Sequence, residues 1–220
     1  IKLRLLMKKN LDKKLLVVVP MKDLKDAKSR LNGTLNGKER ELLAKLLFLR
    51  TLTILDTIRS NNKQFFDIGV VTKSFTIKKL IKELNISLIN EKNKGLNLAL
   101  QDSYLWASQK NYKFLAILPA DLADPNPDEI LSFLKHCNHS EKPTVALCPS
   151  NDLGTNAMLL SIPSKLRFSF GQNSFLKHSE ACKNLGILPK ILPFASLRND
   201  VDTRRDFERI RHIKVERSES

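Results

Sequence analysis

Several residue types are scarce in this chain, and each scarcity excludes a class of protein. Only 3 of the 220 residues are cysteines (Cys137, Cys148 and Cys182), and because they form no Cys-x-x-Cys pair, we expect neither a disulfide framework nor a cysteine-based metal site. Aromatic residues make up 6% of the chain and do not alternate with basic ones, which disfavours an RNA-binding surface. The 7 glycines form neither a Walker A loop nor a Gly-x-Gly-x-x-Gly fingerprint.

Long hydrophobic runs are also missing. The longest ones, Leu15–Val19 and Phe114–Leu118, fall far short of the ~20 residues that a membrane-spanning helix needs. The first run follows lysines, but it is shorter than the apolar part of a signal peptide and ends at Pro20. We therefore expect a cytoplasmic protein with no membrane partner. The chain begins with Ile1, and two readings of its start stay open: Met7 is the first residue, or translation begins at an uncommon codon.

What is present is an ordinary globular composition with a large excess of positive charge. Hydrophobic residues are 42% and charged residues 28%, which suits a single domain over residues 1–220 with frayed termini at 1–14 and 214–220. The net charge is +15, and residues 1–30 alone hold ten basic and three acidic side chains. Such a charge indicates a polyanionic partner, either nucleotide phosphates or nucleic acid, whereas a lysine-rich composition explains it about equally well.

Apolar runs alternate with helix signals along the chain. Strands are expected at 15–19, 66–72, 86–89, 114–118, 144–148, 158–162 and 190–194. Helices are expected after Asn36, which forms a capping box with Glu39, at 76–84, 98–109, 127–136 and 174–184, and after Thr203. This alternation predicts an α/β fold with a parallel sheet covered by helices on both faces. Ligands of such folds bind beyond the carboxyl ends of the strands, so the residues that follow each strand are candidates for the site.

The first candidate motif is a basic loop that follows the first expected strand. Its sequence, P-M-K-D-L-K-D-A-K-S-R-L, supplies the cations Lys22, Lys25, Lys28 and Arg30. Several cations on one loop suit a polyphosphate ligand, and a solvated basic loop is the alternative.

The second and third motifs supply carboxylates. Asp121, in the motif L-P-A-D-L, follows a fully apolar strand, where it either holds Mg²⁺ against phosphates or only ends the strand. In the motif D-V-D-T, Asp200 and Asp202 point the same way in an extended chain. One of them completes a metal site with Asp121, or both are surface residues ahead of the helix cap Thr203.

The last two motifs, G-T-N-A and F-x-F-G-x-x-S-F-x-x-H, combine hydroxyl groups with flexible backbone. Thr155 follows a glycine, and Ser174 opens a helix three residues after Gly171. Peptide N–H groups at a helix N-terminus favour an anion. His178 lies one turn further along the same helix face, so it either orients Ser174 or fills space.

A further motif, E-x-x-x-G-L-N-x-A-L, lies at 91–100. Taken together and in this order, the motifs resemble those of one family. They are similar to the guanylyltransferases of coenzyme F(420) biosynthesis, which act on 2-phospho-L-lactate or phosphoenolpyruvate. The resemblance runs from Leu16 to about Ile210. It implies a Rossmann-like nucleotidyltransferase fold with a mostly parallel sheet, and transfer of GMP from GTP with release of pyrophosphate.

The resemblance also implies a role for each motif. Mg²⁺ is expected on Asp121 and on one aspartate of D-V-D-T, preferably Asp202. The residues expected to line the triphosphate are Lys22, Lys28 and Arg30. Those expected to bind the acceptor acid are Thr155, Gly171 and Ser174, and those expected near the guanosine are Glu91, Gly95 and Asn97. The chain departs from the family at Ala123, where proline is frequent, and after Thr203, where the family often reads D-T-P-x-D.

Two other classes of protein stay open. One is a nucleotidyltransferase of the molybdenum-cofactor or nucleotide-sugar type, which usually has a glycine-rich loop after its first strand. The other is a basic nucleic-acid-binding domain, which would leave Asp121 and Asp202 without a role. The sequence does not choose between 2-phospho-L-lactate, phosphoenolpyruvate and 3-phosphoglycerate as acceptor, and it does not fix the oligomeric state.

Overall fold

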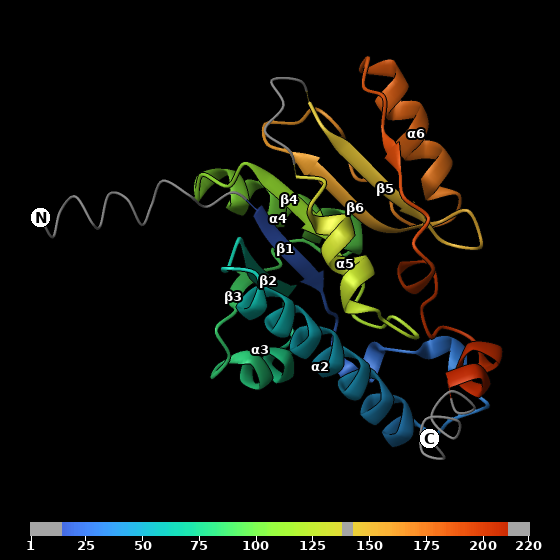
Figure 1. Ribbon diagram of the computed structural model, residues 1–220. Coiled ribbons are helices and arrows are strands. Elements are labelled where there is room, and N and C mark those ends of the chain that lie inside the picture. Colours follow the sequence, from blue (N-terminus) through green and yellow to red (C-terminus); the bar gives the residue numbers. More distant parts are fainter. Residues whose placement is uncertain (1–14, 138–142, 211–220) are drawn as a thin grey trace, which may run out of the picture.

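The computed structural model describes residues 15–137 and 143–210, so Met7 and the termini expected to fray lie outside the described residues. Within them, seven strands form one sheet in the order β3-β2-β1-β4-β6-β5-β7 (Figure 1). The strands are β1 (Leu15–Pro20), β2 (Phe66–Thr72), β3 (Ser87–Asn90), β4 (Phe114–Ile117), β5 (Val145–Pro149), β6 (Thr155–Ser161) and β7 (Lys190–Ile191). The helices are α2 (Gly37–Asn61), α3 (Phe75–Ile81), α4 (Leu96–Gln109), α5 (Pro127–Leu134) and α6 (Ser174–Asn184), with 3₁₀ turns at Leu24–Asp26, Ser29–Leu31 and Ala195–Leu197. Residues 204–210 are also helical.

The central strand β1 shows why the sheet is buried on both faces. Its side chains alternate between two apolar cores. Leu15, Val17 and Val19 belong to the core under α2, α3 and α5, whereas Leu16 and Val18 belong to the core under α4 and α6. All five side chains are fully buried. This explains why β1 is an unbroken apolar run, whereas a strand with one face in water alternates apolar and polar residues. The expected α/β architecture with helices on both faces is confirmed.

Two expected helix starts are confirmed by their capping hydrogen bonds. The N–H of Glu39 donates to the side chain of Asn36, and the N–H of Asn36 donates to the carboxylate of Glu39. At the last helix, the N–H of Thr203 donates to Asp206 at 2.7 Å, and the N–H of Asp206 donates back to the Thr203 hydroxyl at 3.3 Å. Both are capping boxes, which satisfy N–H groups that a helix leaves without intrahelical partners.

One strand departs from the parallel sheet that the alternation predicts. β6 runs antiparallel to both β4 and β5, whereas β1 is parallel to β2 and β4. The reason is the short connection between β5 and β6, residues 150–154, since a parallel crossover needs a dozen or more residues. β6 also begins at Thr155 rather than at Met158. Because β6 is reversed, Thr155 lies at the edge where β4 and β5 end.

The expected strand at 190–194 is shorter in the structure, because β7 ends at Ile191. Pro193 has no N–H with which to continue the ladder. Within residues 15–137 and 143–210, no helix combines the length and the apolarity that crossing a membrane requires.

Candidate functional site

A cleft of about 1180 Å³ lies beyond the carboxyl ends of β1, β2, β4 and β5. The cleft brings together ten of the eleven residues expected from the sequence to form a site. These are Lys22, Lys28, Arg30, Glu91, Gly95, Asp121, Thr155, Gly171, Ser174 and Asp202. The parallel strands explain this gathering, because their carboxyl ends meet at one edge of the sheet.

Asp121 and Asp202 meet because two distant segments form a short antiparallel bridge. Leu122 pairs with Asp200, and the N–H of Val201 donates to the carbonyl of Asp121 at 3.1 Å. A second backbone bond runs from the N–H of Ala123 to Asn199 at 2.9 Å. The motif L-P-A-D-L and the motif D-V-D-T are thus fixed side by side by backbone contacts.

Arg50 of α2 supports this bridge from within the fold. Its guanidinium donates to the carbonyl of Leu122 and, at 3.2 Å, to that of Ala123. These carbonyls directly follow Asp121, so the clamp limits movement of the loop that carries the carboxylate. Sequence reasoning assigned Arg50 only to a helix and missed this contact.

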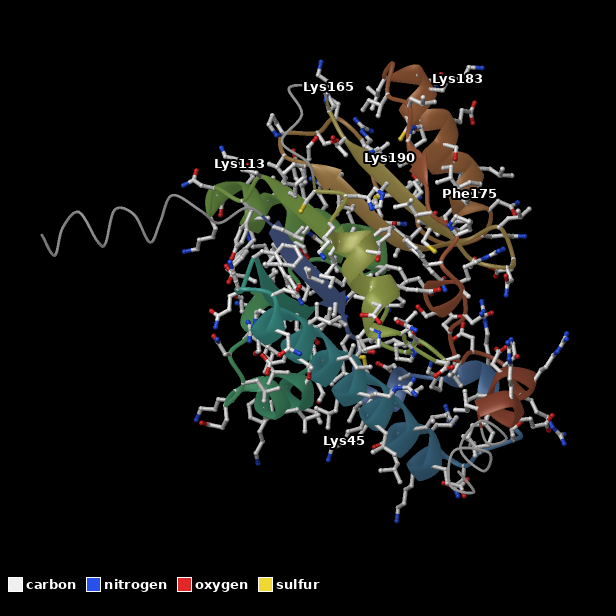
Figure 2. The ribbon with its side chains drawn as sticks, viewed as in Figure 1. Lys45, Lys113, Lys165, Phe175, Lys183 and Lys190 are labelled. Carbon is white, nitrogen blue, oxygen red and sulfur yellow. The ribbon has the colours of Figure 1, made fainter. Side chains whose placement is uncertain are left out.

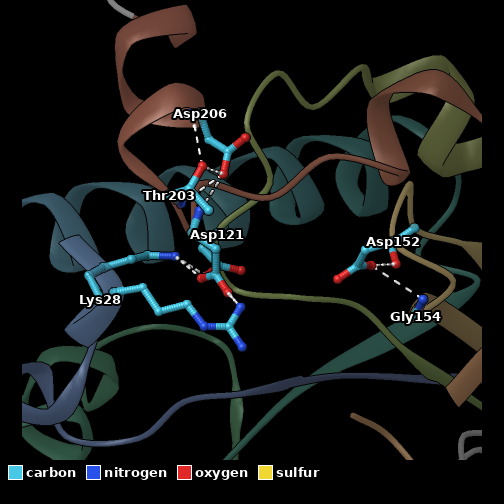
Figure 3. A network of polar contacts seen from close by, with 9 residues as sticks. Lys28, Asp121, Asp152, Gly154, Thr203 and Asp206 are labelled. Atoms are coloured by element: carbon cyan, nitrogen blue, oxygen red, sulfur yellow. Dashed lines mark hydrogen bonds and ion pairs between the residues drawn. The ribbon is translucent and has the colours of Figure 1, made fainter. Parts of the chain in front are cut away.

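The basic loop directs two cations at the carboxylates (Figure 3). Lys28 is ion-paired with Asp121, and its Nζ lies 3.4 Å from Oδ1 of Asp202. The Nη1 of Arg30 lies 3.0 Å from Oδ2 of Asp202. Only 4% of the Lys28 side chain is exposed, and a charge so deeply buried needs such partners. The loop is held in place by its buried apolar residues Leu24, Ala27 and Leu31.

Asp200 adds a third carboxylate to this end of the cleft. Its pKa is raised to about 7, mainly by burial and also by the charges of Asp121 and Asp202, while Lys28 opposes them. Asp200 is thus close enough to Asp121 and Asp202 for their charges to act on it. Within residues 15–137 and 143–210, no group of three or more His, Cys, Asp or Glu side chains has the geometry to hold a metal ion.

The cleft is also lined by two buried hydroxyl residues, Thr155 and Ser174. The N–H of Thr155 donates to Oγ of Ser174 at 2.8 Å. Ser174 is the first residue of α6, and Asn173 holds the N-cap position before it. Oγ1 of Thr155 lies 2.9 Å from Nδ1 of His178. Nearby, Gly171 has φ = 125°, a conformation that side chains disfavour.

His178 is fully buried. The N–H of Ser169 donates to its Nε2 at 2.9 Å, and the ring of Phe170 packs edge-on at 5.0 Å between centroids. The pKa of His178 is lowered to about 4, mainly by burial and also by the charge of Lys177.

Asn97 is the expected site residue that does not line the cleft. Its side-chain amide donates to the carbonyl of Phe170 at 3.1 Å and accepts the N–H of Phe170 at 2.7 Å. Asn97 therefore holds the segment just before Gly171 in place. Glu91 and Gly95, from the same motif, do line the cleft.

Sequence reasoning missed several lining residues. The additional basic ones are Lys73, Lys94, Arg198 and Arg205. Lys73 directly follows β2, so the strand-end rule itself pointed to it. Asp152 is a missed acidic residue, and hydrogen bonds from Ser150 and from the N–H of Gly154 lower its pKa. A Cβ at Gly154 would lie 2.6 Å from Oγ of Ser150, so a larger residue there would displace that hydroxyl.

Outside the cleft, the positive charge is spread over the molecule. Lys113, Lys165 and Lys183 are all exposed, and Figure 2 shows them pointing outward from separate segments of the chain. A nucleic-acid surface would gather such residues on one face. This distribution favours the lysine-rich composition as the source of the excess charge.

Comparison with known proteins agrees with the geometry. A family model described as "Guanylyl transferase CofC like" matches residues 15–216. The chain is 31% identical to a 3-phospho-D-glycerate guanylyltransferase of Colwellia psychrerythraea, over 87% of this chain and 89% of that protein. It is 29% identical to a phosphoenolpyruvate guanylyltransferase of Rubrobacter xylanophilus, over 88% and 91%. It is 28% identical to a 2-phospho-L-lactate guanylyltransferase of Methanosphaera stadtmanae, over 90% and 83%.

The fold also resembles that of solved structures. A nucleotide-diphospho-sugar transferase structure from Desulfovibrio desulfuricans superposes with a TM-score of 0.69 at 15% sequence identity, over 89% of this chain and 85% of that one. At this identity the likeness concerns the fold, and the Rossmann-like nucleotidyltransferase architecture expected from the sequence is confirmed.

Proposed function

The chain belongs to the family of CofC-like guanylyl transferases, and from this premise we propose that it transfers GMP from GTP to the phosphate of a small phosphorylated carboxylic acid. A phosphate oxygen of the acid attacks the α-phosphorus of GTP, the bond to the β-phosphate breaks, and pyrophosphate leaves. The proposed acceptor is phosphoenolpyruvate or 2-phospho-L-lactate, as in coenzyme F(420) biosynthesis. The name of one relative makes 3-phospho-D-glycerate a third acceptor to test.

The observation that carries the proposal is the division of the cleft into two unlike ends. Lys28 and Arg30 meet two carboxylates at one end, and the hydroxyl residues Thr155 and Ser174 line the other. Transfer of a nucleotidyl group depends mainly on positioning and on neutralising phosphate charge. We assign the triphosphate to the basic loop, including Lys22, and the acid to the hydroxyl end with Gly171.

Magnesium fits the carboxylate end. Asp121 and Asp202 already share one cation, Lys28, so their oxygens converge on a single point. Carboxylate oxygens are the ligands that Mg²⁺ takes from proteins, and it usually draws the rest from water and substrate phosphates. We propose that Asp121 and Asp202 hold Mg²⁺ with GTP. The ion would neutralise negative charge on the phosphates.

The proposal also covers the residues near the guanosine and the cellular location of the protein. Glu91 and Gly95 line the cleft at the end of β3 and the start of α4, which suits a nucleoside next to the triphosphate. Asn97 acts there through the segment at Phe170. A GTP-dependent reaction implies a cytoplasmic protein, in which Cys148 and Cys182 remain thiols.

The proposed function is tested by incubating the protein with GTP, Mg²⁺ and each of the three acids in turn. We expect pyrophosphate and one GMP–acid adduct, detected by mass spectrometry, with the largest rate for one acid. Parallel reactions with ATP and CTP test the choice of base. No adduct with any acid, or equal use of all nucleotides, contradicts the proposal.

The two rival functions predict different results in the same series. A nucleotidyltransferase of the molybdenum-cofactor or nucleotide-sugar type transfers the nucleotide to molybdopterin or to a sugar phosphate, and to none of the three acids. A nucleic-acid-binding domain is not protected against heat by GTP, whereas its RNA binding weakens steeply as salt rises.

A further inference from the structure

The imidazole of His178 has both ring nitrogens engaged, and the two contacts together fix its proton. The N–H of Ser169 can only donate, so Nε2 of His178 must accept that bond. The ring is neutral near pH 7, because burial holds its pKa well below neutrality. Its single proton therefore lies on Nδ1 and is donated to Oγ1 of Thr155 at 2.9 Å.

This bond decides what the hydroxyl of Thr155 can do. A hydroxyl has one hydrogen, and at Thr155 that hydrogen cannot point at Nδ1, which is itself the donor. Among the described residues, no other partner is found for Oγ1, and Thr155 lines the cleft. The hydroxyl hydrogen is thus directed to the cleft.

The hydroxyl oxygen of Ser174, like that of Thr155, accepts a hydrogen bond from the protein. Its Oγ accepts the N–H of Thr155 at 2.8 Å, so its own hydrogen also stays available. Both residues are almost fully buried, with exposed fractions of 6% for Thr155 and 1% for Ser174. Two hydroxyls that the protein itself uses as acceptors become two O–H donors, which is the arrangement that an anion needs and a cation does not.

We propose that His178 is a positioning residue for the acceptor acid. It acts through Thr155, holding that hydroxyl so that Thr155 and Ser174 both donate to the phosphate or carboxylate of the acid. The inference rests on the proposed function. The surroundings of the ring fit this role, since Phe170 packs edge-on against it and Asn97 holds Phe170 by both backbone groups.

Two conservative variants separate the contacts of the ring. In His178→Asn the amide nitrogen can replace Nδ1 and still donate to Thr155, whereas in His178→Gln the amide can replace only Nε2. We expect His178→Gln to raise the KM for the acid about 10-fold, as for loss of one hydrogen bond to a charged group, and to leave the KM for GTP unchanged. His178→Asn should restore a KM near that of the wild type. A purely structural role predicts equal effects on both substrates and overturns the inference.

A double-mutant cycle tests whether His178 acts through the hydroxyl of Thr155. Thr155→Val removes the hydroxyl and keeps the shape of the side chain. If the hydroxyl is the intermediary, then adding His178→Gln to Thr155→Val leaves the KM for the acid at its single-variant value. Effects that multiply instead show two independent roles and overturn the inference.

A readout that needs no turnover separates this inference from the proposed function. The ¹⁵N chemical shifts of the His178 ring should show a protonated Nδ1 and an unprotonated Nε2, and the opposite tautomer overturns the inference. If the wild type transfers GMP to none of the acids, the proposed function fails, and calorimetry with phosphoenolpyruvate then decides the inference. Weaker binding in His178→Gln supports it, whereas equal binding, or none to the wild type, overturns it.

Discussion

The ammonium group of Lys28 is ion-paired with the carboxylate of Asp121, although 93 positions separate the two residues in the sequence. The same nitrogen lies 3.4 Å from Asp202. Lys28 thus occupies the point at which the two proposed metal ligands converge. We expect Lys28 to turn towards the phosphates when Mg²⁺ and GTP bind, because the metal then supplies the positive charge that the carboxylates need.

The first prediction concerns Asp121. Asp121→Asn keeps the shape of the side chain and removes its charge, so we expect a folded protein with kcat lowered by about 10²- to 10³-fold, or ~3–4 kcal/mol of transition-state stabilisation. Steady-state kinetics at saturating GTP and acid measure this loss, and circular dichroism checks the fold. The matched control is Asp124→Asn, an exposed position in the same loop that does not line the cleft. Near-normal turnover in Asp121→Asn would refute the metal site.

The second prediction concerns the basic loop. Lys28→Ala and Arg30→Ala should raise the KM for GTP without changing which acid is preferred, because both cations lie at the carboxylate end of the cleft. The effect should be larger for Lys28, since the Arg30 side chain is 72% exposed and its charge is screened by water. Lys25→Ala is the control, because Lys25 belongs to the same loop but does not line the cleft. A changed acid preference with normal GTP kinetics would show that the loop binds the acceptor instead.

The third prediction concerns Ser174. Ser174→Ala should raise the KM for the acid by roughly 10- to 150-fold, the value of one hydrogen bond to a charged group, and affect GTP far less. It should also lower the free energy of unfolding by about 1–3 kcal/mol, because the N–H of Thr155 loses its acceptor. The comparison variant is Ser179→Ala on the same helix, whose hydroxyl has no partner among the described residues. Titrating each substrate at saturation of the other is the measurement, and equal effects on both would place the acceptor elsewhere.

Much of this site was predictable because the relevant signals are local. An apolar run ended by proline marks β1 and a fully apolar run marks β4, so the strand-end rule led directly to the basic loop and to Asp121. Helix starts were likewise readable, since the capping box of Asn36 and Glu39 involves neighbours in the chain.

What the sequence concealed depends on distant contacts. The reversal of β6 follows from the short turn N-D-L-G that precedes it. The asparagine and glycine of this turn favour a hairpin, whereas the alternation of strands and helices led to the prediction of a parallel strand. No local pattern reveals that Asn97 binds Phe170, because 73 positions separate the two residues in the sequence. The same holds for Arg50, which acts on a loop far along the chain.

The last prediction concerns the pH dependence of stability. The pKa of His178 falls from an ordinary value of 6.5 in the unfolded chain to about 4 in the folded protein. Because the folded state resists protonation, the stabilisation from a neutral His178 is fully present above pH 6.5 and is lost as the pH falls towards 4. A difference of this size corresponds to about 3 kcal/mol of unfolding free energy.

Other groups, chiefly carboxylates, titrate in the same range. The measurement therefore compares the wild type with His178→Asn, which keeps a donor for Thr155 but does not titrate. Urea unfolding at pH 7.5 and pH 4.5 should show a steeper loss of stability in the wild type than in the variant. Equal losses would mean that His178 is protonated in the folded protein at pH 4.5 as fully as in the unfolded chain, and its Nε2 could then not accept the N–H of Ser169.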